Sequence, residues 1–165
     1  MGAGKSTVGA RCAAALGREF VDTDEVVAAI AGRPVPELFA TDGERAFRAL
    51  ERTALADALA SPAPSVIATG GGAVLDPENR KQLRAHAFVV WLDARPDQLA
   101  ARVGSGDDRP LLRGDPAGAL RRLDAVRRPV YEAVADAVVD TGDRAVDAVV
   151  ADVLERVTHA QERVS

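Results

Sequence analysis

Residues 2–7 read Gly-Ala-Gly-Lys-Ser-Thr, and an Ala-rich stretch with helical character, 8–16, follows directly. In a phosphate-binding loop, glycines let backbone N–H groups converge on the phosphates, Lys reaches the β and γ phosphates, and Ser or Thr coordinates magnesium. The last two roles fall to Lys5 and Ser6. The rest of the predicted nucleotide-binding loop is Gly2, Ala3, Gly4 and Thr7. The competing interpretation is a flexible N-terminal tail that contains these letters by chance.

The loop is shorter than the full motif. That motif has a further glycine five residues before Gly4 and a β-strand before that glycine, whereas this sequence starts at Met1. Without the strand, a parallel sheet lacks what is normally a central member, so two neighbouring strands stay unpaired and apolar surface is exposed. We therefore expect an α/β fold whose first strand is missing, from either a misassigned start or an impaired molecule.

Composition bounds the class of protein. The chain has 165 residues, which fits one domain, and it is 47% apolar, 28% charged and only 4% aromatic. With 21 Lys and Arg against 25 Asp and Glu, the net charge is -4, so no global basic field attracts nucleic acid or an anionic membrane. No apolar run reaches membrane-spanning length, and the lone Cys12 suits a reducing compartment. These features predict a cytoplasmic protein with a local anion site.

Strand-like and helix-like patterns alternate along the chain. Short apolar runs rich in β-branched residues, at 65–68, 87–92 and 137–139, predict strands buried on both faces, and a shorter candidate precedes Asp22. Apolar residues that recur every three or four positions predict helices around 47–59 and 146–157. This alternation predicts three layers, with a parallel sheet flanked by helices and a ligand crevice beyond the carboxyl ends of the strands.

Two groups of charged residues have more than one interpretation. Asp22-Thr23-Asp24, at a predicted strand tip, could serve magnesium and a substrate hydroxyl, or Asp22 could simply cap the next helix. Arg48 lies four residues after Glu44 and three before Glu51, so a solvated ion-pair ladder explains it. A carboxylate-binding role for Arg48 requires a partner outside its helix.

The remaining candidates for ligand-binding residues are glycines and arginines. Gly70, Gly71 and Gly72 follow a predicted strand directly, where they permit close backbone approach to a ligand. Arg109 lies in the Gly-rich stretch 104–114, which fits a mobile lid that delivers a cation to a transferring phosphoryl group. Each further arginine could equally be a solvated surface residue: Arg102, Arg127 and Arg144.

In identity, order and spacing, these motifs resemble the shikimate kinase family over nearly the whole chain. The motifs are Gly-Ala-Gly-Lys-Ser-Thr, Asp-Thr-Asp, Phe-Ala-Thr-Asp-Gly-Glu with Phe-Arg, Gly-Gly-Gly-Ala-Val, Arg-Pro-Leu-Leu and Arg-Arg-Pro-Val-Tyr. The resemblance implies a single P-loop kinase domain of the nucleoside monophosphate kinase-like fold. It also implies a substrate-binding segment at about 24–60, a lid at about 104–115, and transfer of the γ-phosphoryl group of ATP to the 3-hydroxyl of shikimate in aromatic amino acid biosynthesis.

Carried over position by position, the resemblance assigns roles to single residues. Asp24 would bind and polarise the attacking hydroxyl, with Asp22 and Ser6 near magnesium. Arg48 and Arg127 would hold the substrate carboxylate, and Gly71, within the glycine run 70–72, a ring hydroxyl. Lys5 and Arg109 would neutralise the phosphates, while Arg102 and Arg144 would flank the adenine. The substrate pocket would be lined by Phe39, Phe47, Pro110 and Leu111.

Alternatives from the same and from other classes stay open. A gluconate-type or nucleotide kinase shares the fold, the loop and the lid, although a nucleotide kinase would need groups that read a base. A catalytically weak nucleotide-binding protein is the alternative from a different class, because the loop begins late. We expect a monomer that uses ATP and Mg²⁺ and has a small-molecule partner.

Overall fold

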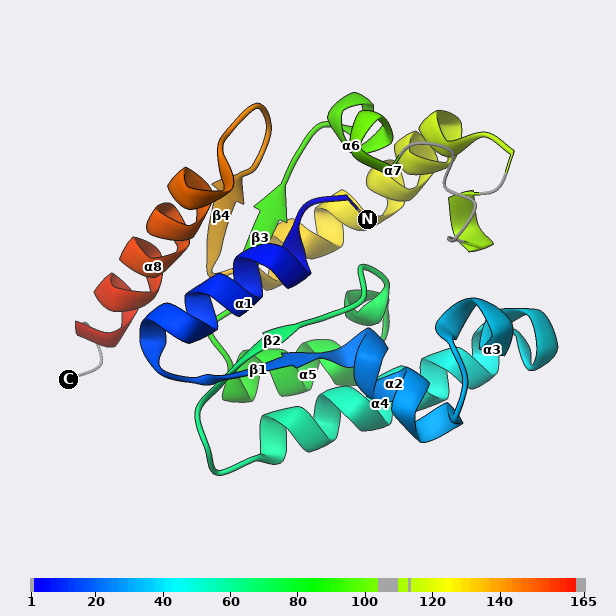
Figure 1. Cartoon of the computed structure of the whole chain (residues 1–165), viewed down its shortest axis with the longest axis horizontal. Helices are drawn as coiled ribbons and strands as arrows, with labels where there is room; N and C mark the ends of the chain where they lie inside the picture. Colours follow the sequence, from blue (N-terminus) through cyan, green and yellow to red (C-terminus); the bar gives the residue numbers. More distant parts are fainter. Residues whose placement is uncertain (1, 104–109, 113, 163–165) are drawn as a thin grey trace.

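The computed structural model describes residues 2–103, 110–112 and 114–162. The described strands are β1 (Glu19–Asp22), β2 (Ser65–Ala68), β3 (Val90–Asp93) and β4 (Ala137–Asp140). The described helices are α1 (Lys5–Leu16), α2 (Thr23–Ala31), α3 (Val35–Thr41), α4 (Gly43–Ala60), α5 (Pro77–His86), α6 (Pro96–Val103), α7 (Pro116–Val134) and α8 (Val146–Glu162). Two 3-10 turns, η1 (Ala73–Leu75) and η2 (Pro110–Leu112), complete the alternation that the sequence predicts (Figure 1).

Local sequence signals begin and end the helices that carry the site. α1 starts after Gly4, whose φ of 82° is left-handed, and it ends at Gly17, whose N–H closes the last turn. Asp22 caps α2 by accepting a hydrogen bond from the backbone N–H of Asp24. Asp115 caps α7 in the same way through the N–H of Gly118.

The strands form two separate parallel pairs. β1 pairs with β2 from Glu19↔Ser65 to Asp22↔Ala68, and β3 pairs with β4 from Val90↔Ala137 to Asp93↔Asp140. No strand pairing joins β2 to β3 within the described residues, so the inner edges of the two pairs have no partner strand. This confirms the expectation that two neighbouring strands stay unpaired.

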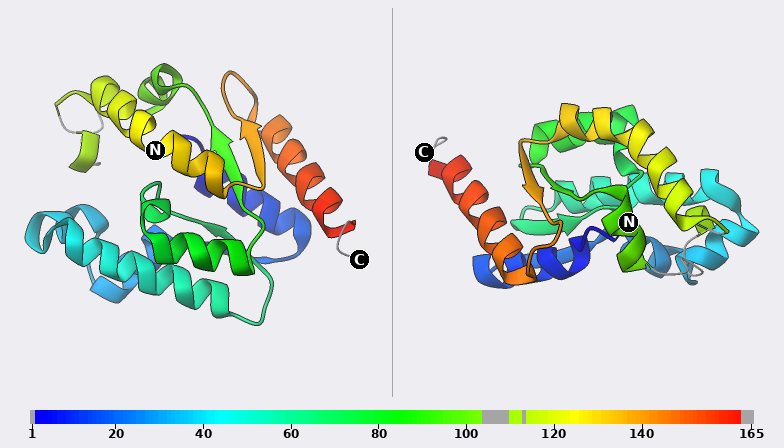
Figure 2. Two further views of the ribbon diagram at one scale, coloured as in Figure 1. Left: turned by 180° about the vertical axis from the view of Figure 1, so that it is seen from behind. Right: turned by 90° about the horizontal axis from the view of Figure 1, so that it is seen from above.

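Helices cover both faces of the two strand pairs (Figures 1 and 2). α1 and α8 pack on one face through a cluster that contains Val8, Cys12, Val139, Val149 and Val153. α4, α5 and α7 pack on the other face through a cluster that contains Leu55, Val74, Leu83 and Val134. The predicted three-layer α/β architecture is therefore confirmed. In the described part of the chain, no helix is both long and apolar enough to cross a membrane.

Two details of the strand prediction were wrong. The third strand starts at Val90 rather than at residue 87, because Ala87 caps α5 and Phe88 is 40% exposed. Burial on both faces also fails: in β2 only Ala68 is fully buried, in β3 no residue is, and in β4 Val138 is 45% exposed. Residues of β2 and β3 line a cavity between the two strand pairs, so their side chains are not packed against a further strand within the described structure.

Candidate active site

The Gly-Ala-Gly-Lys-Ser-Thr segment forms a tight loop at the start of α1. Gly2 and Gly4 have φ values of +74° and +82°, a conformation that L residues with side chains rarely adopt. A Cβ on Gly2 would lie 2.9 Å from Val103 Cγ2, so the loop packs closely on α6. The first N–H groups of α1 point out of the helix at this loop, and the helix dipole makes that end attractive to anions.

Ser6 and Asp22 meet at the loop. The Ser6 hydroxyl donates a 2.6 Å hydrogen bond to Asp22 Oδ2, while Asp22 Oδ1 accepts the backbone N–H of Asp24 at 3.0 Å. The two interpretations of Asp22 are thus not exclusive, because one carboxylate oxygen caps α2 and the other contacts the phosphate loop. A hydroxyl and a carboxylate side by side are ligands that Mg²⁺ accepts.

The glycine run after β2 is a surface on which charged side chains rest. A Cβ on Gly70 would lie 2.4 Å from Glu51 Oε1 and 3.1 Å from Asp24 Oδ1. A Cβ on Gly72 would lie 2.5 Å from Arg48 Nη1. Neither glycine has a positive φ, so close approach rather than backbone conformation requires glycine here. The loop is also tied to α2, because the buried Thr23 hydroxyl accepts the N–H of Gly70 at 3.3 Å.

Arg48 forms the predicted ladder and has contacts outside it. Its guanidinium donates to Glu44 Oε1 at 3.0 Å and to Glu51 Oε2 at 2.7 Å, and it lies 5.1 Å from the centre of the Phe47 ring. Glu51 is 1% exposed, and burial raises the pKa of its carboxyl despite the opposing effect of Arg48. The same guanidinium lies close to Gly72, outside its own helix, where a Cβ would come within 2.5 Å of its terminal nitrogens.

Arg127 and Tyr131 bring α7 to the same place. Arg127 is 6% exposed, and the Tyr131 hydroxyl donates a 2.5 Å hydrogen bond to the carbonyl of Gly71. Burial raises the pKa of Tyr131, which keeps its hydroxyl a donor. Two buried polar atoms among the described residues here lack a hydrogen-bond partner, Arg127 Nε and Glu51 Oε1. Such atoms are costly unless a ligand or water satisfies them.

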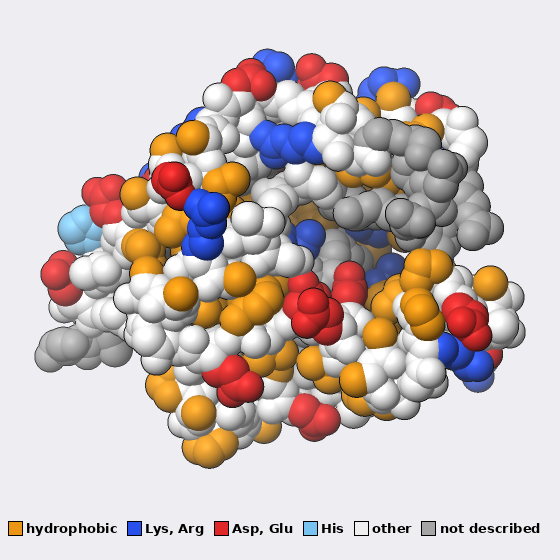
Figure 3. Space-filling model, viewed as in Figure 1, with side chains coloured by type: hydrophobic (Ala, Val, Ile, Leu, Met, Phe, Trp, Pro, Cys, Tyr) orange, Lys and Arg blue, Asp and Glu red, His pale blue; other side chains and the backbone are white. Residues whose placement is uncertain are grey.

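These side chains line one cavity of about 460 Å³. Its charged lining is Asp24, Arg48, Glu51, Arg102 and Arg127. The glycine run 70–72 and the apolar residues Phe39, Phe47 and Leu111 form the rest of its wall, together with Val35, Pro36 and Val103. Figure 3 shows the hollowed face, where basic and acidic side chains gather at the opening. The rings of Phe39 and Phe47, 4.7 Å apart, make one wall apolar.

A smaller cavity of about 120 Å³ links this space to the phosphate loop. Ala3 and Lys5 line it on one side, and Gly70, Gly71 and Arg127, which also line the larger cavity, on the other. The loop and the charged cavity are therefore neighbours.

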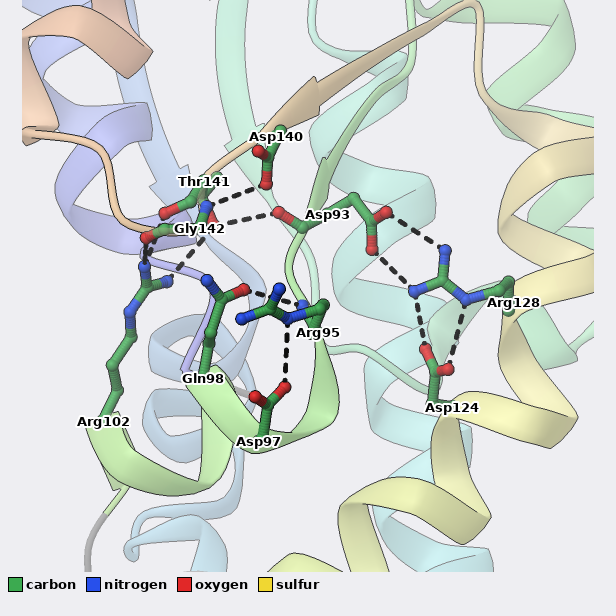
Figure 4. Close-up of polar contacts among 10 residues, drawn as sticks. All are labelled: Asp93, Arg95, Asp97, Gln98, Arg102, Asp124, Arg128, Asp140, Thr141 and Gly142. Carbon is green, nitrogen blue, oxygen red and sulfur yellow. Dashed lines mark hydrogen bonds and ion pairs between the residues drawn. The ribbon is translucent and has the colours of Figure 1, made fainter.

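The remaining predicted arginines differ in position. Arg102 donates to Thr141 Oγ1 at 3.2 Å and to the carbonyls of Thr141 and Gly142 (Figure 4). It also donates to the carbonyl of Gly2 at 3.4 Å. Arg144 instead donates to Asp152 and to carbonyls of Asp140 and Ala148, and it lines neither cavity. Arg109 and most of the predicted lid, 104–109 and residue 113, lie outside the described residues, as does the side chain of Pro110.

Sequence reasoning missed two residues that shape the site, Thr23 and Tyr131. Both act on the glycine run, from 47 and 60 residues away in the sequence. No spacing pattern signals such pairs, because they form only when α2 and α7 fold against the end of β2. Glu51 was visible in the sequence as one end of a helical ladder, but its burial was not.

A phosphate loop at the start of α1, a Ser–Asp pair beside it, and a charged cavity across a glycine run define a P-loop phosphotransferase that acts on a small molecule. A family model described as shikimate kinase matches residues 1–158. The chain belongs to the shikimate kinase family.

Individual relatives agree with this membership. The shikimate kinase of Symbiobacterium thermophilum is 49% identical over 99% of this chain and 95% of its own length. That of Salinispora arenicola is 50% identical over 87% of this chain and 84% of its own. Among solved structures, shikimate kinase from Acinetobacter baumannii in complex with shikimate aligns with a TM-score of 0.90 and 33% identity, covering 97% of this chain and 89% of that one. The enzyme from Aquifex aeolicus aligns with a TM-score of 0.85 and 30% identity, covering 98% and 94%.

Proposed function

We propose that this chain transfers the γ-phosphoryl group of ATP to the 3-hydroxyl of shikimate. The observation that carries the proposal is the cavity in which Arg48 and Arg127 lie with Asp24 beside a phosphate loop. Family membership and the similarity to an Acinetobacter baumannii enzyme solved with shikimate support the choice of substrate.

In this proposal, the phosphate loop and α6 bind the nucleotide. Backbone N–H groups of residues 2–7 hold the phosphates, and Lys5 neutralises the β and γ groups. Arg102, which spans Gly2 and the Thr141–Gly142 turn, borders the adenine. The position of Arg144 lends no support to its predicted part in that contact.

Magnesium is assigned to Ser6 and Asp22, the pair joined by the 2.6 Å hydrogen bond. Among the described residues, no group of three or more His, Cys, Asp or Glu could hold a metal alone. A Mg²⁺ ion carried in with the nucleotide fits such a pair, because this ion usually binds through one or two protein ligands, phosphate oxygens and water. It would supply positive charge to the β and γ phosphates.

The substrate carboxylate binds between Arg48 and Arg127. Each guanidinium can donate two parallel hydrogen bonds, which fixes the orientation of a ring acid. The unpartnered Nε of Arg127, buried in this cavity, supports the assignment, because a carboxylate would satisfy it. Phe39, Phe47 and Leu111 give the ring an apolar wall, and Gly71 offers backbone to a ring hydroxyl.

Transfer then needs little beyond positioning and charge. Asp24 orients the attacking hydroxyl and accepts its proton as the new oxygen–phosphorus bond forms and the bond to the ADP oxygen breaks. Lys5 stabilises the charge on the transferred group, and Arg109 is proposed to add to it from the lid. The proposal also comprises a monomeric enzyme located in the cytoplasm, and the free, buried Cys12 fits such a reducing compartment.

Substrate choice is tested by ADP release from the chain with ATP and magnesium. Shikimate is compared with gluconate, CMP and AMP, which represent the neighbouring kinase classes. Turnover with shikimate alone is the expected result. Faster turnover with gluconate or a nucleotide would refute the proposal, and tight ATP binding without turnover on any of the four would favour a nucleotide-binding protein.

The carboxylate assignment has its own test. Arg48→Ala should raise KM for shikimate at least tenfold, a loss of ~1.4 kcal/mol, with KM for ATP little changed. Arg45→Ala is the matched control, because Arg45 lies on the same helix, is exposed and does not line the cavity. Equal rises in both KM values would remove Arg48 from the carboxylate site.

A further inference from the structure

The glycine run 70–72 forms a β-turn together with Ala73. The N–H of Ala73 donates to the carbonyl of Gly70 at 3.1 Å, which closes the four-residue turn. Gly72, the third residue of the turn, has φ −97° and ψ −10°, and the φ of Gly71 is not positive. The turn is therefore of type I, in which φ and ψ of the third residue are about −90° and 0°.

Type I is not the form that this sequence prefers. Glycine at the third position favours type II, which requires a positive φ at that residue. The two forms differ by rotation of one peptide unit, the one between Gly71 and Gly72, by roughly 180°. Because both flanking residues are glycine, no side chain opposes this rotation. A contact from outside the turn must select type I.

Tyr131 of α7 supplies that contact. Its hydroxyl donates a 2.5 Å hydrogen bond to the carbonyl oxygen of Gly71, which belongs to the peptide unit that would rotate. In a planar trans peptide the N–H points opposite to the carbonyl, so the N–H of Gly72 points away from Tyr131. Gly72 lines the substrate cavity and Tyr131 does not, so this N–H faces the cavity side of the turn.

The neighbouring peptide units have other partners. The Thr23 hydroxyl accepts the N–H of Gly70 at 3.3 Å, and the carbonyl of Gly70 closes the turn itself. The carbonyl of Gly72 accepts the N–H of Leu75 at 3.0 Å. The orientation of the unit between Gly71 and Gly72 thus depends on the Tyr131 hydroxyl.

We propose that Tyr131 is a positioning residue that holds this turn in type I, so that the turn presents an N–H rather than a carbonyl to the substrate cavity. In type II, the carbonyl of Gly71 would replace that donor and place partial negative charge where an anionic substrate binds. Arg127 lies one helical turn before Tyr131 on α7, so the same face of one helix supplies a cation to the cavity and a hydroxyl to the turn. The effect on substrate rests on the proposed function, whereas the selection of the turn type does not.

The turn type is tested with Tyr131→Phe, which removes the hydroxyl and keeps the ring that packs 5.5 Å from Trp91. Gly-Gly pairs occur in this sequence only within the glycine run. Protein labelled with carbonyl-¹³C and ¹⁵N glycine therefore gives two NMR signals from directly linked labels, the amides of Gly71 and Gly72. In type I these two amide hydrogens lie close together, whereas in type II the amide hydrogen of Gly72 lies close to the α hydrogens of Gly71.

The unmodified protein should show the contact between the two amide hydrogens. Tyr131→Phe should show the type II contact, alone or mixed with the first. Thr158→Val is the matched control, because the Thr158 hydroxyl also donates to a backbone carbonyl, that of Leu154 at 3.0 Å, and Thr158 lines neither cavity of the site. Its spectrum should match that of the unmodified protein.

Steady-state kinetics measure the consequence for the reaction. We expect Tyr131→Phe to raise KM for shikimate about five- to tenfold, because the cavity loses a donor, and to change KM for ATP by less than about twofold. Thr158→Val should leave both KM values unchanged. A selective rise in KM for shikimate is not expected from a general loss of packing, which would affect both substrates.

Three results would overturn the proposal. The first is a Tyr131→Phe spectrum that keeps only the type I contact, and the second is a changed turn with KM for shikimate unaltered. The third is an equal rise in both KM values, which would assign Tyr131 a structural role. If the unmodified protein does not turn over shikimate, the proposed function fails, and the NMR comparison still decides whether Tyr131 selects the turn.

Discussion

Arg128 of α7 binds Asp93 at the end of β3 through two parallel contacts, Nη1–Oδ2 at 3.1 Å and Nη2–Oδ1 at 2.9 Å (Figure 4). The same guanidinium contacts Asp124 and lies 4.9 Å from the centre of the Trp91 ring. Hydrogen bonds to the two carboxylates raise the pKa of Arg128. This contact fixes α7 against β3, and the next residue toward the amino end of the helix, Arg127, is the one that enters the substrate cavity.

Loss of this contact should therefore act on the substrate site. We expect Arg128→Ala to lower the free energy of unfolding by about 1–3 kcal/mol, because Asp93 and Asp124 lose a shared cation. KM for shikimate should rise more than KM for ATP, as α7 loses its register. Urea denaturation and steady-state kinetics measure both effects.

Two variants complete the test of Arg128. Arg128→Lys should restore only part of the affinity, because Lys cannot form the paired contact. Arg122→Ala serves as the control on the same helix, since its side chain is 72% exposed and its nearest carboxylate is 3.7 Å away. Unchanged kinetics in Arg128→Ala at a measurable loss of stability would confine Arg128 to a structural role.

Glu51 should make stability depend on pH. Because its pKa is raised above the ordinary 4.5, the folded state holds this proton more tightly than the unfolded state. The contribution of Glu51 to the free energy of unfolding is therefore largest below pH 4.5 and declines as the pH rises through the raised folded pKa. Glu51→Gln should lack this decline, which urea denaturation at a series of pH values measures.

Glu44→Gln is the matched control for Glu51, because Glu44 shares the partner Arg48 while its side chain is 55% exposed. Its stability profile should parallel that of the unmodified protein. Parallel profiles for Glu51→Gln and the unmodified protein would contradict the assignment of a raised pKa to Glu51.

Gly72 should matter through Arg48. A Cβ at residue 72 would lie 2.5 Å from both terminal nitrogens of Arg48, so Gly72→Ala must displace a guanidinium that Glu44 and Glu51 hold. We expect KM for shikimate to rise about tenfold, or ~1.4 kcal/mol, with KM for ATP unchanged. In an Arg48→Ala background the same substitution should cost little, and additive effects would contradict the coupling.

Lys5 should affect chemistry rather than folding. Lys5→Ala removes a cation from the proposed phosphate site, and we expect kcat to fall by on the order of a hundredfold or more. Lys81→Ala is the matched control, because Lys81 is 75% exposed and pairs only weakly with Glu78. Turnover within a few fold of the unmodified protein would exclude Lys5 from the transfer step.

Patterns local in the sequence gave the most reliable predictions. The short apolar run at 65–68 predicted the bounds of β2 correctly. Asp24, Arg48 and Arg127, which the motifs single out, line one cavity. Predictions that depended on neighbours across the fold were weaker. Residues 87–89 have the composition of a strand, yet the chain there caps α5 before β3 starts, because β4 pairs only from Val90 onward.

Some contacts lay beyond any reading of local spacing. The burial of Glu51 depends on the glycine run, which approaches it closely only because residues 70 and 72 lack side chains. Asp22 had two competing interpretations that the structure combines, since its two oxygens face different partners. A single sequence does not show that the two oxygens of one carboxylate accept hydrogen bonds from different partners.

Trp91 gives the protein a built-in optical reporter. It is the sole tryptophan of the chain, it lies beneath the Arg128 guanidinium and 5.5 Å from the Tyr131 ring, and it lines the cavity next to the phosphate loop. Its emission therefore comes from one known place, with no background from a second indole. Nucleotide binding, movement of α7 and filling of the cavity should each change that emission, so they can be followed in real time without any label.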